Sequence, residues 1–261
     1  MNIIEVNNLY KEFCATRSLS DMLMRPFKKA KRKIVLNGVS LKVKNNELFC
    51  LVGPNGAGKT TLIKILCTLI LPTSGSAVVN GHDVTDMDKK VRESIGFISG
   101  DERSFFWRLS CLENLRFFAV LYNIPSSRID EEIKRVIDIT GLDEAGKRFQ
   151  ECSTGTKQRL GIARSLLREP EVLFMDEPTR SLDPLIAANF RKFIKEELVK
   201  KHKKTVFFTT HNLNEAEVMA GRLAILDKGK IKAVGTLEEL RQTSGSQEKS
   251  IEDVFSYYIG Q

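Results

Sequence analysis

The nine residues 53–61 read Gly-Pro-Asn-Gly-Ala-Gly-Lys-Thr-Thr and constrain the fold of this chain more than any other segment. They fit the pattern G-x-x-x-x-G-K-[ST], which is typical of a loop that binds phosphate groups. The apolar run 48–52 precedes them and predicts a buried strand, and residues 61–69 follow with a helical pattern. The N-terminus of that helix would place partial positive charge where phosphates lie.

Individual residues of this loop have distinct chemical roles. Its glycines let backbone N–H groups point into one concavity. Lys59 would add a positive charge beside β- and γ-phosphates, and the Thr60 hydroxyl is suited to hold Mg²⁺. A glycine turn without a ligand is the alternative, and the strand-loop-helix context argues against it. The candidate nucleotide-binding residues here are Gly53, Pro54, Asn55, Gly56, Ala57, Gly58, Lys59, Thr60 and Thr61.

Length and composition fit a protein with a substantial core. The 261 residues suit one large domain or a domain with a subdomain, and 42% are apolar. No stretch approaches the roughly 18 uninterrupted apolar residues of a membrane span. Residues 1–5 lack the basic and apolar regions of a signal peptide, so we expect the chain to stay in the cytoplasm. Five widely spaced cysteines predict reduced thiols and no zinc site.

The formal net charge of +8 is concentrated in two clusters, at residues 25–33 and 200–204. A solvated surface is the simpler interpretation of both clusters. An anionic membrane surface or a nucleic acid could also exploit such charge. For the segment 25–33 we expect a position near lipid headgroups, where each basic residue contributes about 1 kcal/mol.

Apolar strand patterns alternate with helical patterns along most of the chain, which predicts an α/β fold with a mostly parallel sheet covered on both faces. A helix-rich insertion interrupts this alternation at about residues 105–150. The predicted strands are 3–9, 36–43, 47–52, 76–81, 172–175 and 206–208, and the predicted helices are 112–119, 129–139, 157–167 and 185–200.

Carboxylates and a histidine follow two of these strands directly. Asp176, after the strand 172–175, is placed to hold Mg²⁺, and Glu177 to orient a water toward a γ-phosphate. His211 follows the strand 206–208 through two threonines and is suited to bind the γ-phosphate or that water. A structural role for His211 is an equally weighted alternative on these grounds.

A further helix start lies at residues 152–160, where Ser153 and Gly155 precede a helical pattern. Serine is a favourable N-cap residue, which is one interpretation. A helix N-terminus with a hydroxyl and a glycine N–H is also a possible second phosphate site. The spacing alone does not choose between the two.

Taken in order, these elements resemble the nucleotide-binding domain of ATP-binding cassette (ABC) transporters over residues 3–240. The loop 53–61 resembles Walker A, and residues 173–177 resemble Walker B with its catalytic glutamate. Residues 153–159 resemble the ABC signature, residues 181–183 the D-loop, and His211 the switch histidine. The resemblance implies a P-loop NTPase fold with an antiparallel β region on the N-terminal side of the core sheet.

In domain terms, the resemblance implies a single ABC ATPase domain at residues 1–240. A helical subdomain at about 101–168 would be inserted in its α/β core, and residues 241–261 would form a helical tail. The implied cofactors are ATP and Mg²⁺, with Thr60 and Asp176 holding the metal. The implied catalytic residues are Lys59, Glu177 and His211.

Two further nucleotide contacts come from the resemblance alone. Phe13 matches the aromatic residue that stacks on adenine, although a core residue near a strand end is the alternative. Asp183 matches the aspartate of the D-loop. Together with Ser153 and Gly155, these residues complete the candidate nucleotide-binding set.

Departures from the family pattern occur in two motifs. The signature usually reads Leu-Ser-Gly-Gly-Gln, whereas this chain has Cys152, Thr154 and Thr156 at the first, third and fifth positions. The Ser-Thr-Gly variant resembles subgroups of ABC exporters. The family also has glutamine where this chain has Gly100. Either a neighbouring carboxylate at residues 101–102 takes over that contact with metal and water, or the contact is absent.

As for partners, the resemblance implies two such chains, expected to be identical, that face head to tail and share each ATP. ATP binding would close this dimer and hydrolysis would open it. The pore would be a separate transmembrane permease subunit, so the chain would lie at the cytoplasmic face of the cell membrane and power export. Residues 100–107 are the predicted docking surface, with their apolar cluster 105–107 as its centre; ordinary subdomain core is the alternative for that cluster.

No nucleic acid is expected as a partner. The alternative is a soluble ABC ATPase that acts on the ribosome or on nucleic acid. ABC ATPases of the ribosomal type have two cassettes in one chain, and those that act on chromosomes carry long coiled coils between the motifs. This chain shows neither pattern. A nucleotide-gated scaffold without hydrolysis is a second alternative, against which the presence of Glu177 argues.

Overall fold

The computed structural model describes residues 1–14, 32–99, 104–180, 182–245 and 250–260. Its strands form two sheets, one of four strands in the order β2-β1-β4-β5 and one of six in the order β10-β9-β3-β8-β7-β6. The strands of the smaller sheet are β1 (Asn2–Cys14), β2 (Arg32–Lys44), β4 (Ser74–Val79) and β5 (His82–Asp83). The strands of the larger sheet are β3 (Leu48–Val52), β6 (Ile95–Ser99), β7 (Val172–Asp176), β8 (Thr205–Thr210), β9 (Arg222–Asp227) and β10 (Lys230–Gly235).

Strand direction separates the two sheets. All pairs in the smaller sheet are antiparallel, and in the larger sheet only β9 and β10 pair antiparallel. Every residue of β3 and β8 is buried, as expected for parallel strands covered on both faces. The predicted α/β fold, with a mostly parallel core sheet and an antiparallel β region on the N-terminal side, is confirmed.

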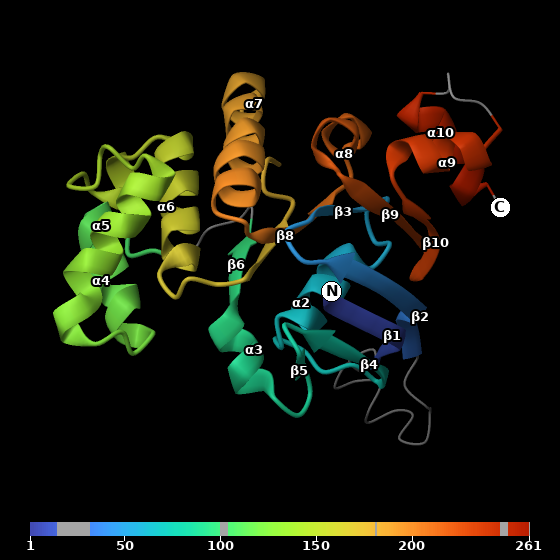
Figure 1. Ribbon diagram of the computed structural model, residues 1–261, viewed down its shortest axis with the longest axis horizontal. Helices are drawn as coiled ribbons and strands as arrows, with labels where there is room; N and C mark the ends of the chain where they lie inside the picture. The colour runs from blue at the N-terminus through green and yellow to red at the C-terminus, as the bar shows by residue number, and fades with distance from the viewer. Residues whose placement is uncertain (15–31, 100–103, 181, 246–249, 261) are drawn as a thin grey trace, which may run out of the picture.

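Helices cover the larger sheet and form a group of their own at one end of the molecule (Figure 1). The α-helices are α2 (Lys59–Leu66), α3 (Asp88–Ser94), α4 (Cys111–Leu121), α5 (Ile129–Thr140), α6 (Thr154–Leu166), α7 (Pro184–Phe193), α8 (Leu213–Met219), α9 (Leu237–Thr243) and α10 (Ile251–Ile259). Single 3₁₀ turns lie at Ser126–Arg128 and Phe149–Glu151, and a π-helix, Ile194–Lys201, continues α7.

The side chains of β3 point alternately to the two faces of the larger sheet, and each face belongs to a different cluster of the hydrophobic core. Leu48, Cys50 and Val52 belong to the cluster that includes the apolar faces of α4 to α10. Phe49 and Leu51 belong to the other cluster, with the smaller sheet and α2. Successive side chains of a strand point to opposite faces, so one short strand serves both layers. The larger sheet is therefore the common wall of the two layers.

The predicted helix-rich insertion is present as α4, α5 and α6, which pack on one another. A capping box of Ser110 and Glu113 begins α4. Gly141, with φ of 59°, ends α5 in the left-handed conformation that glycine adopts without strain. Ser153 caps the N-terminus of α6 through its hydroxyl, which accepts from the Thr156 N–H at 3.1 Å.

Several element boundaries differ from the sequence-based expectations. The first strand continues to Cys14 instead of ending at residue 9, because its polar end pairs with the start of β2. An ion pair between Arg32 and Glu12, 2.7 Å long, joins those ends. Most of the basic segment 25–33 lies outside the described residues. The helix expected at 185–200 consists of α7 and the π-helix.

The C-terminal segment packs against the body of the protein. Residue 240, the expected domain boundary, lies inside α9. Ile251, Val254 and Tyr258 on α10 are buried in the same cluster as the core strands, and α10 contacts β9 and β10. Hydrophobic burial therefore joins residues 250–260 to the domain. In the part of the chain that the structure describes, no helix is long and apolar enough to cross a membrane.

Candidate functional site

The loop that follows β3 folds tightly around the side chain of Lys59. Its Nζ donates to the carbonyl oxygens of Gly53 at 2.7 Å and Pro54 at 3.1 Å. A Cβ at Gly53 would lie 2.2 Å from the Leu226 carbonyl oxygen, so this position admits only glycine without a backbone shift. The loop is thus shaped by its own lysine and by close contact with β9.

The ammonium group of Lys59 is nearly buried, with 5% of the side chain exposed. Burial lowers the pKa of Lys59, and the carboxylates of Glu177 and Asp176 oppose that shift. Its Nζ lies 3.8 Å from Glu177 Oε1. The site therefore holds a desolvated cation, and an anionic ligand next to it would stabilise the charged form.

Two hydroxyl groups meet the carboxylate of Asp176 at the end of β7. Thr60 Oγ1, at the start of α2, donates to Asp176 Oδ1 at 3.2 Å, and Thr209 Oγ1 on β8 donates to the same oxygen at 2.6 Å. Asp176 and Thr209 are register partners in adjacent parallel strands, which brings their side chains together. A carboxylate and a hydroxyl from separate elements are the oxygen donors that a hard divalent cation prefers.

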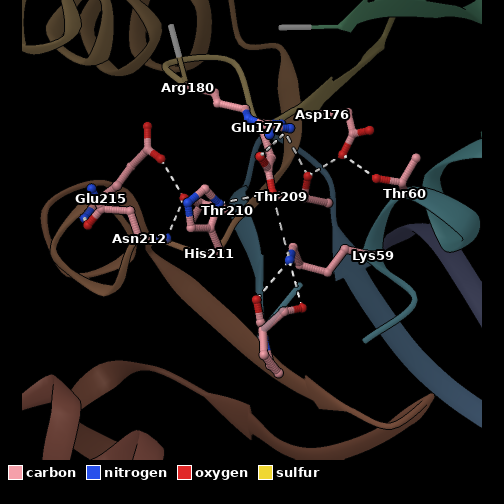
Figure 2. Close-up of polar contacts among 12 residues, drawn as sticks. Lys59, Thr60, Asp176, Glu177, Arg180, Thr209, Thr210, His211, Asn212 and Glu215 are labelled. Atoms are coloured by element: carbon pink, nitrogen blue, oxygen red, sulfur yellow. Dashed lines mark hydrogen bonds and ion pairs between the residues drawn. The ribbon is translucent and has the colours of Figure 1, made fainter. Parts of the chain in front are cut away.

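Glu177 directly follows β7 in a left-handed conformation, with φ of 49°. Its backbone N–H donates to the carbonyl oxygen and the hydroxyl of Thr209, at 3.1 and 3.2 Å. His211 Nδ1 lies 3.0 Å from Glu177 Oε1 (Figure 2). An ionised carboxylate only accepts hydrogen bonds, so Nδ1 carries the proton in this contact.

The second oxygen of Glu177, Oε2, is buried and has no hydrogen-bond partner among the described residues. It forms an ion pair with Arg180, whose Nη1 lies 3.6 Å away. A buried acceptor with a free lone pair is unfavourable unless a ligand or water satisfies it. Glu177 therefore has one oxygen engaged by His211 and one available.

The side chains of Lys59, Thr60, Asp176 and Glu177 line a cavity of about 980 Å³. The loop contributes Asn55, Gly56, Gly58, Lys59, Thr60 and Thr61 to its wall, and Asp176 at the end of β7 and Glu177 just after it face the cavity. Several lining residues were missed by the sequence analysis. They are Ile34, Val35, Ser99, Arg180 and Lys228, together with Lys33, which was noted only for its charge. No sequence pattern marks them: Lys33, Ile34 and Val35 come from β2, Ser99 from the end of β6, and Arg180 and Lys228 from turns that follow β7 and β9.

Phe13, the expected adenine contact, is not among the residues that line this cavity. It is the register partner of Lys33, which does line it. The Phe13 ring is 41% exposed, and Lys11 Nζ lies 4.8 Å from the ring centroid. Phe13 therefore lies one strand away from the cavity wall, on the same sheet.

A second, smaller cavity of about 250 Å³ lies beside the N-terminus of α6. Ser153, Gly155 and Thr156 line it together with residues of α7. It shares no lining residue with the large cavity. Within one chain, the structure thus does not bring Ser153 and Gly155 to Lys59. Asp183 caps α7 without a side-chain capping bond, and Gly100 lies outside the described residues.

Comparison with known proteins places these motifs in a family. The profile of the family described as "ABC transporter" matches residues 36–180, which is more than half of the chain. The chain belongs to the ABC transporter family. The family expected from the sequence is therefore confirmed, and the matched range includes both the loop around Lys59 and the pair Asp176 and Glu177, which line the large cavity.

Individual ABC proteins show how far the likeness extends. The chain is 39% identical over 212 residues to the probable multidrug ABC transporter ATP-binding protein YbhF of Escherichia coli, covering 81% of this chain and 36% of YbhF. It is 36% identical over 214 residues to the daunorubicin resistance ATP-binding protein DrrA3 of Streptomyces coeruleorubidus, covering 82% and 67%. The chain thus spans about a third of YbhF.

A solved structure described as the ATP binding subunit of an ABC transporter has the same fold. It superposes with a TM-score of 0.78 at 26% sequence identity, covering 98% of this chain and 99% of the other. The shared architecture thus includes the C-terminal helices α9 and α10 as well as the core, since nearly the whole chain is aligned.

Proposed function

We propose that this chain binds and hydrolyses ATP as the nucleotide-binding subunit of an ABC transporter. One observation carries the proposal: a buried lysine, a hydroxyl–carboxylate pair and a carboxylate with one oxygen that accepts no hydrogen bond from the described residues all face one cavity. The lysine is Lys59, the pair is Thr60 with Asp176, and the oxygen is Glu177 Oε2. Phosphoryl transfer requires charge neutralisation and an oriented nucleophile, and this set provides both.

The phosphate chain would lie against the loop, with its backbone N–H groups and Lys59 as donors. Glu177 Oε2 would accept a hydrogen bond from the attacking water, since that oxygen has no hydrogen-bond partner among the described residues. His211 holds Glu177 Oε1, which fixes the direction in which Oε2 points. Each of these roles is positioning or electrostatic, as the reaction demands.

Mg²⁺ fits the donor set of Thr60 and Asp176, whose oxygens lie 3.2 Å apart. Both are hard oxygen ligands, which suit an ion that keeps several waters and binds few protein groups. When bound, Mg²⁺ would neutralise negative charge on the β- and γ-phosphates. Thr209 holds the carboxylate in place by donating to the same oxygen, Asp176 Oδ1.

A second copy of the chain would complete the site. Ser153 and Gly155 border a cavity separate from the one that Lys59 faces, so they cannot serve the same nucleotide within one chain. In a head-to-tail dimer each ATP would lie between the loop of one copy and the α6 N-terminus of the other. Asp183, at the start of α7, would lie near that junction. ATP favours the closed dimer, and hydrolysis removes the bridging phosphate.

A separate permease subunit would receive this movement at the helical insertion. Phe106 and Trp107 are 45% and 62% exposed, and Phe106 packs edge-on against Phe117 at 4.6 Å between ring centroids. Phe105 is buried at 8% exposure and belongs to the subdomain core, so it is not part of the surface. The expectation for that one residue of the cluster 105–107 is corrected.

Export across the cell membrane is the transport direction we propose, with the chain at the cytoplasmic face. The support is the names of YbhF and DrrA3, which refer to multidrug transport and to daunorubicin resistance. Neither relative supports action on the ribosome or on nucleic acid. The transported compound is set by contacts in the permease.

ATP hydrolysis by the wild type and by Glu177→Gln tests the proposal. The substitution keeps the size of the side chain and removes its charge, so ATP binding should persist. We expect hydrolysis to fall by at least about 100-fold. Equal hydrolysis by both proteins would contradict the role of Glu177, and no ATP binding by either would contradict the function itself.

A further inference from the structure

Glu215 carries a buried carboxylate behind the two strand ends that hold the catalytic side chains. It lies in the first turn of α8 and is 3% exposed. Its Oε1 accepts from Thr179 Oγ1 at 2.5 Å, and its Oε2 accepts from Thr210 Oγ1 at 2.6 Å. Figure 2 shows Glu215 and Thr210 pointing toward each other. Both oxygens of a desolvated charge are thus satisfied by hydroxyl groups.

The two threonines flank the catalytic residues in sequence. Thr179 is two residues after Glu177, and Thr210 immediately precedes His211. Along β8 the side chains alternate, so Thr209 bonds Asp176 while Thr210 bonds Glu215. Glu215 therefore joins the segment after β7 to the segment after β8.

Further bonds fix the backbone around His211. The Thr210 hydroxyl, which donates to Glu215, also accepts from the Asn212 N–H at 3.0 Å. The Asn212 side chain caps α8 by accepting from the Glu215 N–H at 3.3 Å. Residues 210–212 are thus held on both sides of His211, whose own ring is 44% exposed and bonds only Glu177 among the described side chains.

Helix α8 has another anchor in the fold. Ala216 and Met219 are completely buried in the hydrophobic core. These apolar contacts hold the helix whether or not residue 215 is charged. The carboxylate adds something that packing does not, namely a fixed spacing between the segments that carry Glu177 and His211.

We propose that Glu215 is a positioning residue for ATP hydrolysis, acting through Thr179 and Thr210 on the contact between Glu177 and His211. The inference rests on the proposed ATPase function. Without the two hydroxyl bonds, Thr210 and the His211 ring that follows it could shift relative to β7. Hydrolysis is sensitive to such displacements, since about 1 Å of misplacement can lower a rate by about 100-fold.

The test uses Thr179→Val and Thr210→Val, which replace a hydroxyl by a methyl group of similar size. We expect each variant to lower kcat about tenfold. KM and the affinity for a non-hydrolysable ATP analogue should stay within about twofold of wild type. Glu217→Gln is the matched control, since Glu217 lies on the same helix but is half-exposed in an ion pair with Arg241; its kcat should be unchanged.

Glu215→Gln and Glu215→Ala give a second measurement. A glutamine amide can still accept from one threonine and donate to the other, so Glu215→Gln should retain more activity than Glu215→Ala. Thermal unfolding and analogue binding show whether each variant is folded. If Glu215→Ala does not fold, the threonine variants still decide the matter.

A double-mutant cycle tests the route through His211. In a His211→Ala background, Thr210→Val should lower kcat no further, because the group that it orients is absent. Wild-type kcat in folded Thr179→Val and Thr210→Val, or an additive loss in the His211→Ala background, would overturn the positioning role. Hydrolysis that is unaffected by Glu177→Gln would instead contradict the proposed function, independently of Glu215.

Discussion

His211 Nδ1 lies 3.0 Å from Glu177 Oε1, so the ends of β8 and β7 are joined through the two side chains expected to carry out hydrolysis. The contact leaves Glu177 Oε2 without a hydrogen-bond partner among the described residues. One oxygen of the carboxylate is therefore used for orientation and the other is available for water. This division of roles predicts how the site responds when the imidazole is removed.

His211→Ala should lower kcat by about 100-fold while ATP affinity changes little. The imidazole orients Glu177, whereas the loop around Lys59 holds the nucleotide. His211 is 44% exposed, so its removal leaves no large cavity and the fold should be retained. Steady-state hydrolysis together with equilibrium binding of an ATP analogue checks this. A parallel loss of binding and hydrolysis would show that His211 holds the nucleotide instead.

Substitutions at Ser153 test the shared site in the proposed dimer. Aspartate, asparagine and serine all cap helices well, so Ser153→Asp and Ser153→Asn should both preserve α6. Aspartate adds a negative charge where a phosphate of the partner's ATP would lie. In a Glu177→Gln background with ATP, we expect a dimer by light scattering for Ser153→Asn and a monomer for Ser153→Asp.

The outcome for the serine variants distinguishes two roles of the α6 N-terminus. If Ser153 is only a cap, both variants will dimerise equally. Gly155→Ala is a further variant at the α6 N-terminus, and its added Cβ would lie 3.6 Å from Ile186, which is an ordinary contact. That variant should fold normally.

Alkaline pH should destabilise the protein through its buried thiols. Burial, reinforced by the contact with Cys152, raises the pKa of the Cys111 thiol from its ordinary 9.0 to about 12. A raised pKa means that the unfolded chain loses its proton first, so this stabilisation is complete below about pH 9 and declines from there toward pH 12. Each pH unit in that window removes up to about 1.4 kcal/mol.

Between about pH 9 and 10.5, the free energy of unfolding of Cys111→Ala should therefore fall by about 2 kcal/mol less than that of the wild type. Urea unfolding across that range measures it, with Cys14→Ala, which removes an exposed thiol, as the control. An identical slope in wild type and Cys111→Ala would show that the Cys111 thiol does not titrate differently on unfolding.

Local pattern was enough to predict most of the fold and the centre of the site. The apolar runs 48–52 and 172–175 are short, fully buried parallel strands, and each is bounded by a chain-breaking residue, Gly53 after the first and Pro170 before the second. Residues that reach the site through sheet pairing carry no such signal. Thr209 supports Asp176 and Glu177 from the next strand, and only the register between β7 and β8 reveals it.

Long-range packing also explains the remaining differences. Glu215 carries no signal in the sequence, because its partners Thr179 and Thr210 lie 36 and 5 positions away and on other elements. The strand β1 extends past residue 9 because β2 offers it a partner, although its own polar end has weak alternation. Phe105 and Phe106 are neighbours of the same type, and tertiary packing buries one and exposes the other.

That difference between Phe105 and Phe106 yields a paired test of the proposed docking surface. The double variant Phe106→Ala with Trp107→Ala removes exposed aromatic area, so stability and ATP hydrolysis of the isolated chain should remain close to wild type. Copurification with the membrane subunit should be lost. Phe105→Ala empties a core position between Phe118 and Phe149 and should destabilise the chain by about 3–5 kcal/mol. Full copurification of the double variant would exclude Phe106 and Trp107 from the interface, because aromatic anchors dominate interface energies when they are buried.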